Sequence, residues 1–310
     1  MTALICGSFA YDSIMVFPGR FKEHILPERI HMLNVSFLVP TMRRNFGGTA
    51  GNIAYNLKLI GGAGHAMGTV GHDFGAYRKW MIDKGVSLKY IADVASEFTA
   101  QAFITTDLDD NQITAFHPGA MNHAHIQKVP TDAGITIGFV SPDGRDGMIQ
   151  HAEQFVAAGI PFVFDPGQGL PMFNGEDLLR FVDQASWIAV NDYESQVLAE
   201  RTGLSHVELA SRVKALVVTR GSSGSQIYAG GRCIDIPVAK PTALKDPTGC
   251  GDAYRAGLIY GIDKGLDWET TGRVASLLGT YKIESDGPQN HVFTQSEFGD
   301  RFKAAFGYSL

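Results

Sequence analysis

The sequence predicts an α/β fold with a doubly wound, mostly parallel β-sheet between helices, and a small second β-sheet. Short, continuous apolar runs recur, and each ends at Gly, Asp, Asn or Ser. Such runs suit strands covered on both faces. Segments with helical spacing lie between them, so strands and helices alternate. The chain also has 36 glycines among 310 residues, above the average of about 7%, and their positions indicate where bare backbone is needed.

The elements of the large sheet follow from these runs. Its predicted strands are residues 4–6, 135–140, 162–164, 187–190 and 215–219. Helical faces are predicted from Ile53, Leu57 and Ile60, and from Ala256, Ile259 and Tyr260. Gly265 is placed to end the second helix. In a sheet of this kind, ligands bind outside the carboxyl ends of the strands.

Two segments, residues 13–44 and 98–117, break the alternation and predict a small β subdomain that covers the site as a lid. The first contains apolar runs at 14–17 and at 35–39 before Pro40, and the second has a hairpin turn at 107–111 between two β-favouring runs. The large domain then comprises residues 1–12, 45–97 and 118–310. Two ordinary surface hairpins are the alternative interpretation.

Composition excludes several classes of protein. Lys and Arg number 26 against 32 Asp and Glu, a net charge of −6, which argues against a sequence-independent nucleic-acid binder. Cys6, Cys233 and Cys250 form no CxxC pair, as expected for a reduced, cytoplasmic protein. The N-terminus lacks a basic segment, and no apolar stretch is long enough to span a membrane.

Residues 246–254, Asp-Pro-Thr-Gly-Cys-Gly-Asp-Ala-Tyr, form the most informative motif. Gly249 and Gly251 precede a predicted helix, so backbone N–H groups and the helix dipole can together attract an anion such as a phosphoryl group. Asp252 would repel that anion unless it acts as a general base on an attacking hydroxyl. A structural helix cap is the alternative.

Residues 45–52, Asn-Phe-Gly-Gly-Thr-Ala-Gly-Asn, also open a predicted helix. Gly47 and Gly48 allow close approach of a ligand, and Asn52 offers a donor and an acceptor. Such uncharged groups suit hydroxyls better than phosphates. Asp12, after the first strand, could accept two neighbouring hydroxyls.

Two further loops follow predicted strands. Residues 219–224, Thr-Arg-Gly-Ser-Ser-Gly, could contact phosphate or nucleotide, or form a tight turn. Asn191 and Glu194 offer oxygen ligands that Mg²⁺ prefers, directly or through water. A helix N-cap with an acidic first turn explains the second loop equally well.

Together these motifs resemble the PfkB, or ribokinase-like, family of carbohydrate and nucleoside kinases over essentially the whole chain. Gly47, Gly48, Gly51 and Asn52 match its first signature, and residues 246–254 match its second, with Cys250 in place of the usual Ala. The family's Asn-x-x-Glu motif is matched by Asn191 and Glu194. Arg255 falls within a departure from the usual Phe-x-Gly and is expected to be a solvated surface residue. Contact with phosphate, from one helical turn away, is the alternative.

The resemblance implies roles for these residues. Asp252 is the catalytic base, Gly249, Cys250 and Gly251 form the anion hole, and Asp12, Gly47, Gly48 and Asn52 contact the acceptor. Asn191, Thr219, Gly221, Gly224 and Thr248 contact the nucleotide, Asn191 and Glu194 order Mg²⁺, and Asp246 is a candidate ligand of a monovalent cation such as K⁺.

Within the family, the opening residues 7–12 and the hairpin 105–120 resemble the adenosine kinase and bacterial nucleoside kinase branch. A purine would need apolar or aromatic faces for stacking, which Phe103 and Phe116 could supply. The expected contacts to the nucleoside are Ser8, Gln101, Phe103 and Phe116. The alternative is that these aromatic residues are core of the β subdomain.

The predicted function is transfer of the ATP γ-phosphoryl group to the 5′-hydroxyl of a purine nucleoside, with Mg²⁺. A ribose or fructose kinase would use the same machinery with a different lid. A non-catalytic nucleotide sensor is the alternative from another class. Exposed strand edges on the lid favour a homodimer, and neither nucleic acid nor membrane is an expected partner.

Overall fold

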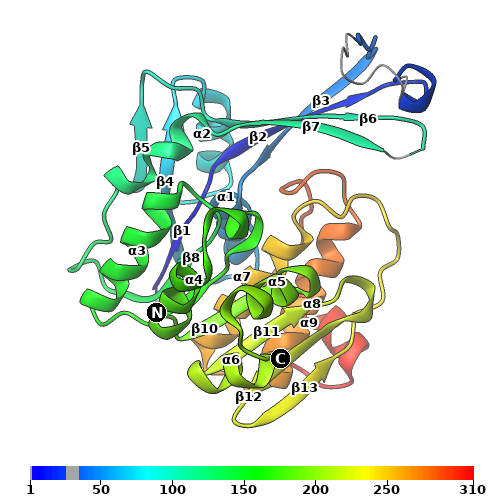
Figure 1. Ribbon diagram of the computed structural model, residues 1–310. Coiled ribbons are helices and arrows are strands. Elements are labelled where there is room, and N and C mark those ends of the chain that lie inside the picture. The colour runs from blue at the N-terminus through cyan, green and yellow to red at the C-terminus, as the bar shows by residue number, and fades with distance from the viewer. Residues whose placement is uncertain (1, 26–34, 110) are drawn as a thin grey trace.

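The computed structural model describes residues 2–25, 35–109 and 111–310, whose strands form two sheets, one of nine and one of four strands (Figure 1). The predicted positions 26–34 and 110 of the lid lie outside the described residues. The large sheet has the order β13-β12-β11-β10-β9-β8-β1-β4-β5. Its strands are β1 Thr2–Cys6, β4 Gly64–Gly71, β5 Tyr90–Val94, β8 Ile135–Val140, β9 Phe162–Phe164, β10 Trp187–Asn191, β11 Ala215–Thr219, β12 Ser225–Ala229 and β13 Arg232–Ile236.

All neighbours in this sheet pair in parallel except β11–β12 and β12–β13, which are antiparallel. The helices are α1 Thr49–Leu59, α2 Gly75–Asp83, α3 Arg145–Ala157, α4 Gly175–Gln184, α5 Asp192–Thr202, α6 His206–Arg212, α7 Cys250–Lys264, α8 Trp268–Ile283 and α9 Gln295–Phe306. The predicted fold class and all five predicted strands of the large sheet are confirmed. Gly265 ends α7 with φ +65°, as expected.

Helices cover both faces of the large sheet. Alternate residues of β1 point to opposite faces: Ala3 and Ile5 join the core beneath α1, α2, α7 and α8, whereas Leu4 and Cys6 join the core beneath α3 and α4. This double coverage explains why the strands read as unbroken apolar runs.

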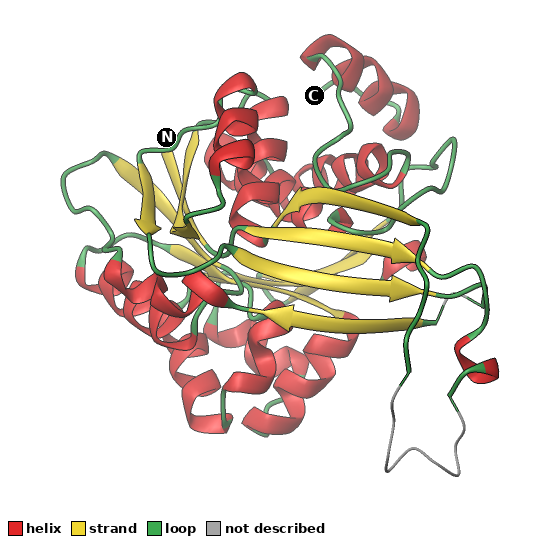
Figure 2. Cartoon of the chain, turned by 90° about the horizontal axis from the view of Figure 1, so that it is seen from above, coloured by secondary structure: helices red, strands yellow, loops and turns green. Residues whose placement is uncertain are grey.

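The small sheet has the order β3-β2-β6-β7 and extends out from the large domain (Figure 1, Figure 2). Its strands are β2 Ala10–Val16, β3 Thr41–Gly47, β6 Ala100–Thr106 and β7 Gln112–His117. The strand predicted at 35–39 is wrong, because those residues have no regular structure and β3 begins after Pro40. Pairing with β2, from Val16 opposite Thr41 to Ala10 opposite Gly47, sets the limits of β3.

The small sheet takes in residues 10–12 and 45–47, which the sequence assigned to the large domain. It therefore reaches to the first turn of α1, where β3 ends at Gly47. Among the residues that the structure describes, no helix combines the length and the hydropathy that crossing a bilayer requires.

Candidate active site

Asp252 lies in the first turn of α7, and its carboxylate accepts a hydrogen bond from Asn52 Nδ2 of α1 at 2.8 Å. Burial raises the pKa of Asp252 to about 7; the negative charges of Asp165 and Asp12 add to the rise, and the Asn52 hydrogen bond and Arg255 oppose it. A carboxyl group that titrates near neutral pH can take a proton from an alcohol. The motif residue expected to be the base therefore has the protonation behaviour of one.

The amide of Asn52 is held in one orientation. Its Oδ1 accepts a hydrogen bond from Gln289 Nε2 at 2.9 Å, and Gln289 Oε1 in turn accepts one from Trp80 Nε1 at 3.1 Å. The indole nitrogen can only donate, so Gln289 accepts from Trp80 through Oε1 and donates to Asn52 Oδ1 through Nε2. This series of hydrogen bonds directs the Asn52 NH₂ group toward Asp252. The base is thus oriented by residues from α1, α2 and the loop before α9.

The backbone before Asp252 presents N–H groups. Gly249 has φ +82°, a conformation that favours glycine, and caps α7. Three residues, Gly249, Cys250 and Gly251, are expected to form the anion hole. The Cys250 N–H donates to Pro247 O at 3.1 Å, whereas the N–H groups of Gly249 and Gly251 have no backbone acceptor among the described residues. Burial raises the pKa of the Cys250 thiol to about 11, so the thiol is neutral and does not repel an anion.

Asp12 of β2 lies beside the glycines of the acceptor loop. A Cβ at Gly47 would come within 2.6 Å of Asp12 Oδ2, and one at Gly48, whose φ is +85°, within 2.5 Å of Ser8 O. Burial raises the pKa of Asp12 to about 6, with a contribution from Asp246. Its carboxylate accepts no hydrogen bond from the described residues, so both oxygens are free for hydroxyl groups.

Ser8, an expected contact to the nucleoside base, is nearly buried. Its Oγ accepts a hydrogen bond from the Thr49 N–H at 3.2 Å and lies 3.3 Å from Thr49 Oγ1. The hydroxyl therefore already supports the first turn of α1.

The register of the small sheet separates the residues expected from its strands. Asn45, Asp12, Ala102 and Phe116 are direct partners across the four strands and share one face. We call this the Asp12 face; Ile14 and Ile104 continue it. Directly opposite partners on the other face include Tyr11 with Gln101 and Ser13 with Phe103.

The Asp12 face is directed toward the loops that carry Asp246 and Gly287. Arg43, which lies on it, has its NH2 atom 3.8 Å from Asp246 Oδ2, and a Cβ at Gly287 would come within 3.0 Å of Asn45 Oδ1.

Phe116 thus shares a face with Asp12, whereas Gln101 and Phe103 point to the opposite face. Gln101 Nε2 donates to Asp73 Oδ2 at 3.0 Å, and Phe103 is 41% exposed. Geometry therefore places these two expected nucleoside contacts on the wrong side of the sheet for Asp12. The position of the turn at 107–111 could have predicted this difference. It pairs Phe103 with Ala115 across the hairpin, so Phe103 and Phe116 lie on opposite faces of the sheet.

The expected nucleotide residues lie together at the carboxyl ends of β10 and β11. Asn191 and Thr219 are direct partners in this parallel pair, and Thr219 Oγ1 donates to Val190 O at 3.3 Å. Gly221 and Gly224 have φ of +53° and +82° on either side of a short turn, and a Cβ at Gly224 would meet Ile236 O at 2.1 Å. The turn needs both glycines, and it also exposes bare backbone.

The expectation of a solvated Arg255 is wrong: its side chain is 5% exposed. Its Nε donates to Asp165 Oδ2 at 3.0 Å, its NH2 atom lies 3.8 Å from Glu194 Oε2, and its NH1 atom donates to Thr219 Oγ1 at 3.5 Å. Asp165 follows β9, so this cluster joins the ends of three strands to α7. A charged partner 90 residues away in sequence is what buries the arginine.

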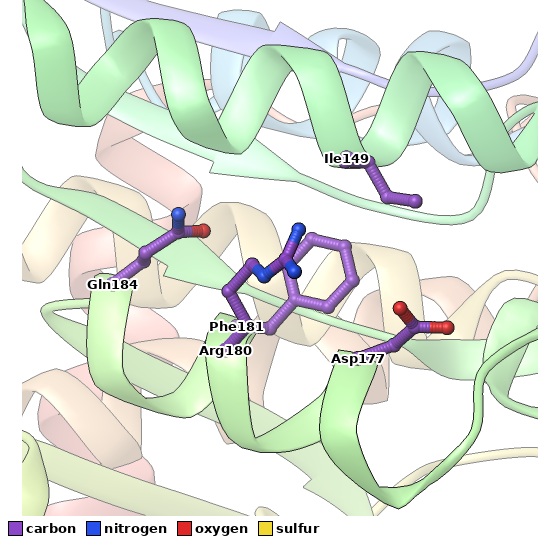
Figure 3. Close-up of a pocket in the computed structure, with 5 residues that line it drawn as sticks. All are labelled: Ile149, Asp177, Arg180, Phe181 and Gln184. Carbon is purple, nitrogen blue, oxygen red and sulfur yellow. The ribbon is translucent and has the colours of Figure 1, made fainter.

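Two cavities lie away from these residues. A cavity of about 10 Å³ between α3 and α4 is lined by Ile149, Asp177, Arg180, Phe181 and Gln184 (Figure 3) and has room for about one water molecule. A larger hollow of about 280 Å³, lined by Trp187 and Trp268 among others, lies at the start of β10, away from the strand ends that carry Asn191 and Thr219.

Comparison with known proteins agrees with this geometry. The model of the pfkB family carbohydrate kinases matches residues 9–295. The chain belongs to this family. A nucleoside kinase of Methanocaldococcus jannaschii is 31% identical over 273 residues, covering 87% of this chain and 89% of the relative.

Solved structures of relatives are closer still. That of Burkholderia thailandensis nucleoside kinase in complex with inosine is 51% identical, with a TM-score of 0.91 over 99% of both chains. That of the same enzyme in complex with ADP-inosine is 52% identical, with a TM-score of 0.87 over 99% of this chain and 97% of that one. The predicted family and its nucleoside kinase branch are confirmed as what this chain resembles.

Asn191 and Glu194, expected to order Mg²⁺, form the helix N-cap that was the alternative interpretation of this loop. Asn191 Oδ1 accepts from the Glu194 N–H at 2.7 Å and Glu194 Oε2 from the Asn191 N–H at 2.8 Å, a capping box that fixes both side chains at the start of α5. Glu194 and Asp165 carry two carboxyl groups against the one guanidinium of Arg255. A magnesium ion held by one or two carboxylates and by phosphates suits this arrangement.

The residues around Asp246 do not fit a separate K⁺ ion. Asp246 Oδ1 accepts the Thr248 N–H and Oδ2 the Gly287 N–H, both at 2.9 Å. The Asp246 carbonyl oxygen accepts a hydrogen bond from Lys282 Nζ at 2.7 Å. A lysine ammonium thus stands where the family resemblance allowed a monovalent cation.

Sequence reasoning missed four residues of this site: Asp165, Lys282, Gln289 and Arg43. Asp165 had a local signal, since it directly ends a predicted strand at the ligand-binding edge. Lys282 and Gln289 had none, because their roles depend on contacts with Asp246 and Asn52, 36 and 237 residues away.

Proposed function

We propose that this protein is an ATP-dependent nucleoside kinase that transfers the γ-phosphoryl group of ATP to the 5′-hydroxyl of a purine nucleoside. One observation carries the proposal. Asp252, whose pKa is raised to about 7, lies at a helix start that can attract an anion, and its carboxylate interacts electrostatically with that of Asp12 on the small sheet. Membership of the pfkB family supports the phosphotransfer, and the nucleoside kinases among its relatives support the acceptor.

The reaction follows from the positions of these groups. Asp252 accepts the proton of the 5′-hydroxyl as the oxygen forms a bond to the γ-phosphorus, and the bond from that phosphorus to the β-phosphate oxygen breaks to release ADP. The N–H groups of Gly249 and Gly251 and the start of α7 stabilise the charge on the transferred group. Asn52 keeps the Asp252 carboxylate in place.

Nucleotide binding falls to the ends of β10 and β11. Thr219 and the turn from Gly221 to Gly224 contact ATP, and Thr248 lies where the phosphates approach α7. Glu194 and Asn191 hold Mg²⁺, through water, and bound Mg²⁺ would neutralise charge on the β- and γ-phosphates. The homologous structure with ADP-inosine supports the use of ATP.

The Asp12 face favours a nucleoside over a free sugar. Asp12 accepts two ribose hydroxyls, and Phe116 lies two strands away in the same row, roughly 10 Å across the sheet. Ala102 lies between them in that row, and Ile104 continues the apolar surface in the next row, which a base can cover and a free sugar cannot. Inosine is the first substrate to test, because the 51% identical relative binds it.

We also propose that the protein is a cytoplasmic homodimer that pairs through the small sheet. Its face opposite Asp12 exposes Met42 (68%), Phe103 (41%) and Ile113 (44%), and an apolar patch of this kind suits a second copy. The three cysteines are free thiols, in keeping with a reducing compartment that supplies ATP.

A substrate panel tests the proposal. Inosine, guanosine, adenosine, cytidine, ribose and fructose are each incubated with ATP and Mg²⁺, ADP release is measured, and the products are identified by mass spectrometry. We expect purine nucleoside 5′-monophosphates. Turnover of ribose or fructose alone would assign a sugar kinase, and ATP binding without any turnover would assign a nucleotide sensor.

A further inference from the structure

Lys282, in the last turn of α8, is fully buried, with an exposed fraction of 0%. Lysine is rarely buried without a partner for its charge. Its Nζ donates hydrogen bonds to the carbonyl oxygens of Asp246 at 2.7 Å and Ser285 at 2.9 Å. Carbonyl oxygens are also ligands that bind K⁺, so the ammonium lies in surroundings that suit a monovalent cation.

The two carbonyls belong to loops that meet behind the anion hole. Asp246 begins the loop that leads to Gly249, and Ser285 begins the turn after α8. The Asp246 carboxylate bonds both loops as well, through the N–H groups of Thr248 and Gly287. Lys282 and Asp246 together therefore fix the backbone on which the Gly249 and Gly251 N–H groups depend.

The pKa of Lys282 is lowered from its ordinary value. Burial is the main cause, and the charge of Arg43 adds to it, whereas the carboxylates of Asp246 and Asp286 oppose the lowering. A positive charge at this position also adds to the potential that attracts the transferred phosphoryl group.

We propose that the Lys282 ammonium is a built-in monovalent cation that takes the place of K⁺ beside the anion hole and makes phosphoryl transfer independent of added K⁺. Lys282 touches no substrate, so it is a positioning residue. It carries the same single charge as K⁺ and uses the same kind of oxygen ligand. Only the turnover measurements below rest on the proposed kinase function, because thermal unfolding needs no substrate.

The first experiment compares KCl, NaCl and tetramethylammonium chloride at equal ionic strength. Turnover and Tm of the wild-type protein should differ by less than about twofold and 1 °C between these salts. Several-fold activation by K⁺ over tetramethylammonium would overturn the proposal, since the ammonium would then not replace the ion.

The second experiment compares two variants that both remove the charge. Lys282→Ala leaves room for a hydrated ion, whereas Lys282→Met fills that room with an apolar chain of similar length. Without K⁺, both should lose about tenfold or more in turnover and about 4 °C in Tm. K⁺ should restore part of both quantities in Lys282→Ala and neither in Lys282→Met.

Other outcomes also decide the matter. The proposal would be overturned if Lys282→Ala kept the turnover and the Tm of the wild-type protein in K⁺-free buffer. It would also be overturned if no cation reversed the losses, or if tetramethylammonium reversed them as well as K⁺ does. If neither variant folds, the wild-type salt series decides. If the wild-type protein phosphorylates no nucleoside or sugar, the proposed function fails, whereas the Tm series still tests Lys282.

Discussion

The acceptor half and the nucleotide half of the site both gather carboxyl groups, but they differ in what stands beside them. Among the described residues, no cation lies within ion-pair distance of Asp252 or Asp12, and burial raises their pKa values to about 7 and about 6. Asp165 and Glu194 instead face the buried guanidinium of Arg255 at 3.0 and 3.8 Å.

This difference separates two tasks. A carboxyl group without a cation partner titrates near the pH at which a proton must be moved. Burial raises the pKa values of Asp165 and Glu194 as well, but the fixed charge of Arg255 opposes that rise. The nucleotide half therefore keeps a partly compensated arrangement of charge that can hold a nucleotide and its metal ion. We infer that proton transfer belongs to the acceptor half and charge compensation to the nucleotide half.

The largest expected effect is on the acceptor half, at Asp252→Asn. Removing the base should lower kcat about 10³-fold, because an amide cannot accept the 5′-hydroxyl proton. Nucleoside binding, measured by calorimetry, should remain within about threefold. Turnover retained within tenfold would remove Asp252 from the role of base.

The same variant provides its own folding control. Because the pKa of Asp252 is raised from 3.8 to about 7, the folded protein holds a proton that the unfolded chain releases between these pH values. The group therefore lowers the free energy of unfolding as pH rises through that range. Asp252→Asn should be at least as stable as the wild-type protein at pH 8 in urea unfolding, although it is inactive.

The next effect is expected in the nucleotide half, at Arg255→Met. This change leaves the carboxyl groups of Asp165 and Glu194 buried without their cation, and it should cost about 3–5 kcal/mol of unfolding free energy. Arg301→Met, which removes the partner of Glu284 at a partly exposed pair, should cost about 1 kcal/mol. Equal losses in the two variants would contradict the special role of the buried arginine.

The features that the sequence predicted are set by residues that lie close together in the sequence. The run at 187–190 reads as a strand because both faces are covered, and residues 246–254 place Gly249 and Asp252 at a helix start by spacing alone. The fold class and the helix start that carries Gly249 and Asp252 were therefore within reach of the sequence.

Contacts between distant segments were not within its reach. Arg255 looked like a surface residue because nothing in its own helix showed that Asp165 would meet it. The strand expected at 35–39 had suitable residues, but β3 is positioned by its pairing with β2. No local pattern predicts the bond from Lys282 to Asp246, which lies 36 residues away on another loop.

A smaller effect tests how the acceptor half sets the pKa of its base. The hydrogen bond from Asn52 lowers the pKa of Asp252, so Asn52→Ala should raise it. The acidic limb of kcat/KM, where activity falls as the base is protonated, should move about one unit to higher pH. Weaker nucleoside binding would scale the whole profile without moving the limb.

Asn56→Ala is the matched control for this profile. Asn56 lies one turn further along α1 and is fully buried. It bonds His291 at 2.7 Å and donates to the Asn52 backbone carbonyl at 2.9 Å, but its side chain bonds neither the Asn52 amide group nor Asp252. Its replacement should leave the limb in place. A limb that stays fixed in Asn52→Ala, or moves equally in both variants, would show that Asn52 does not tune the base.

The smallest expected effect compares the two faces of the small sheet. Phe116 lies in one row with Asp12, and Phe103 points to the opposite face, although both are exposed aromatic residues of one hairpin. Phe116→Ala should raise the KM for inosine about fivefold, since a lost stacking contact costs about 1 kcal/mol, with kcat nearly unchanged. Phe103→Ala should leave KM within twofold. The reverse order would place the nucleoside on the face away from Asp12, and Asp12 could then not hold its ribose.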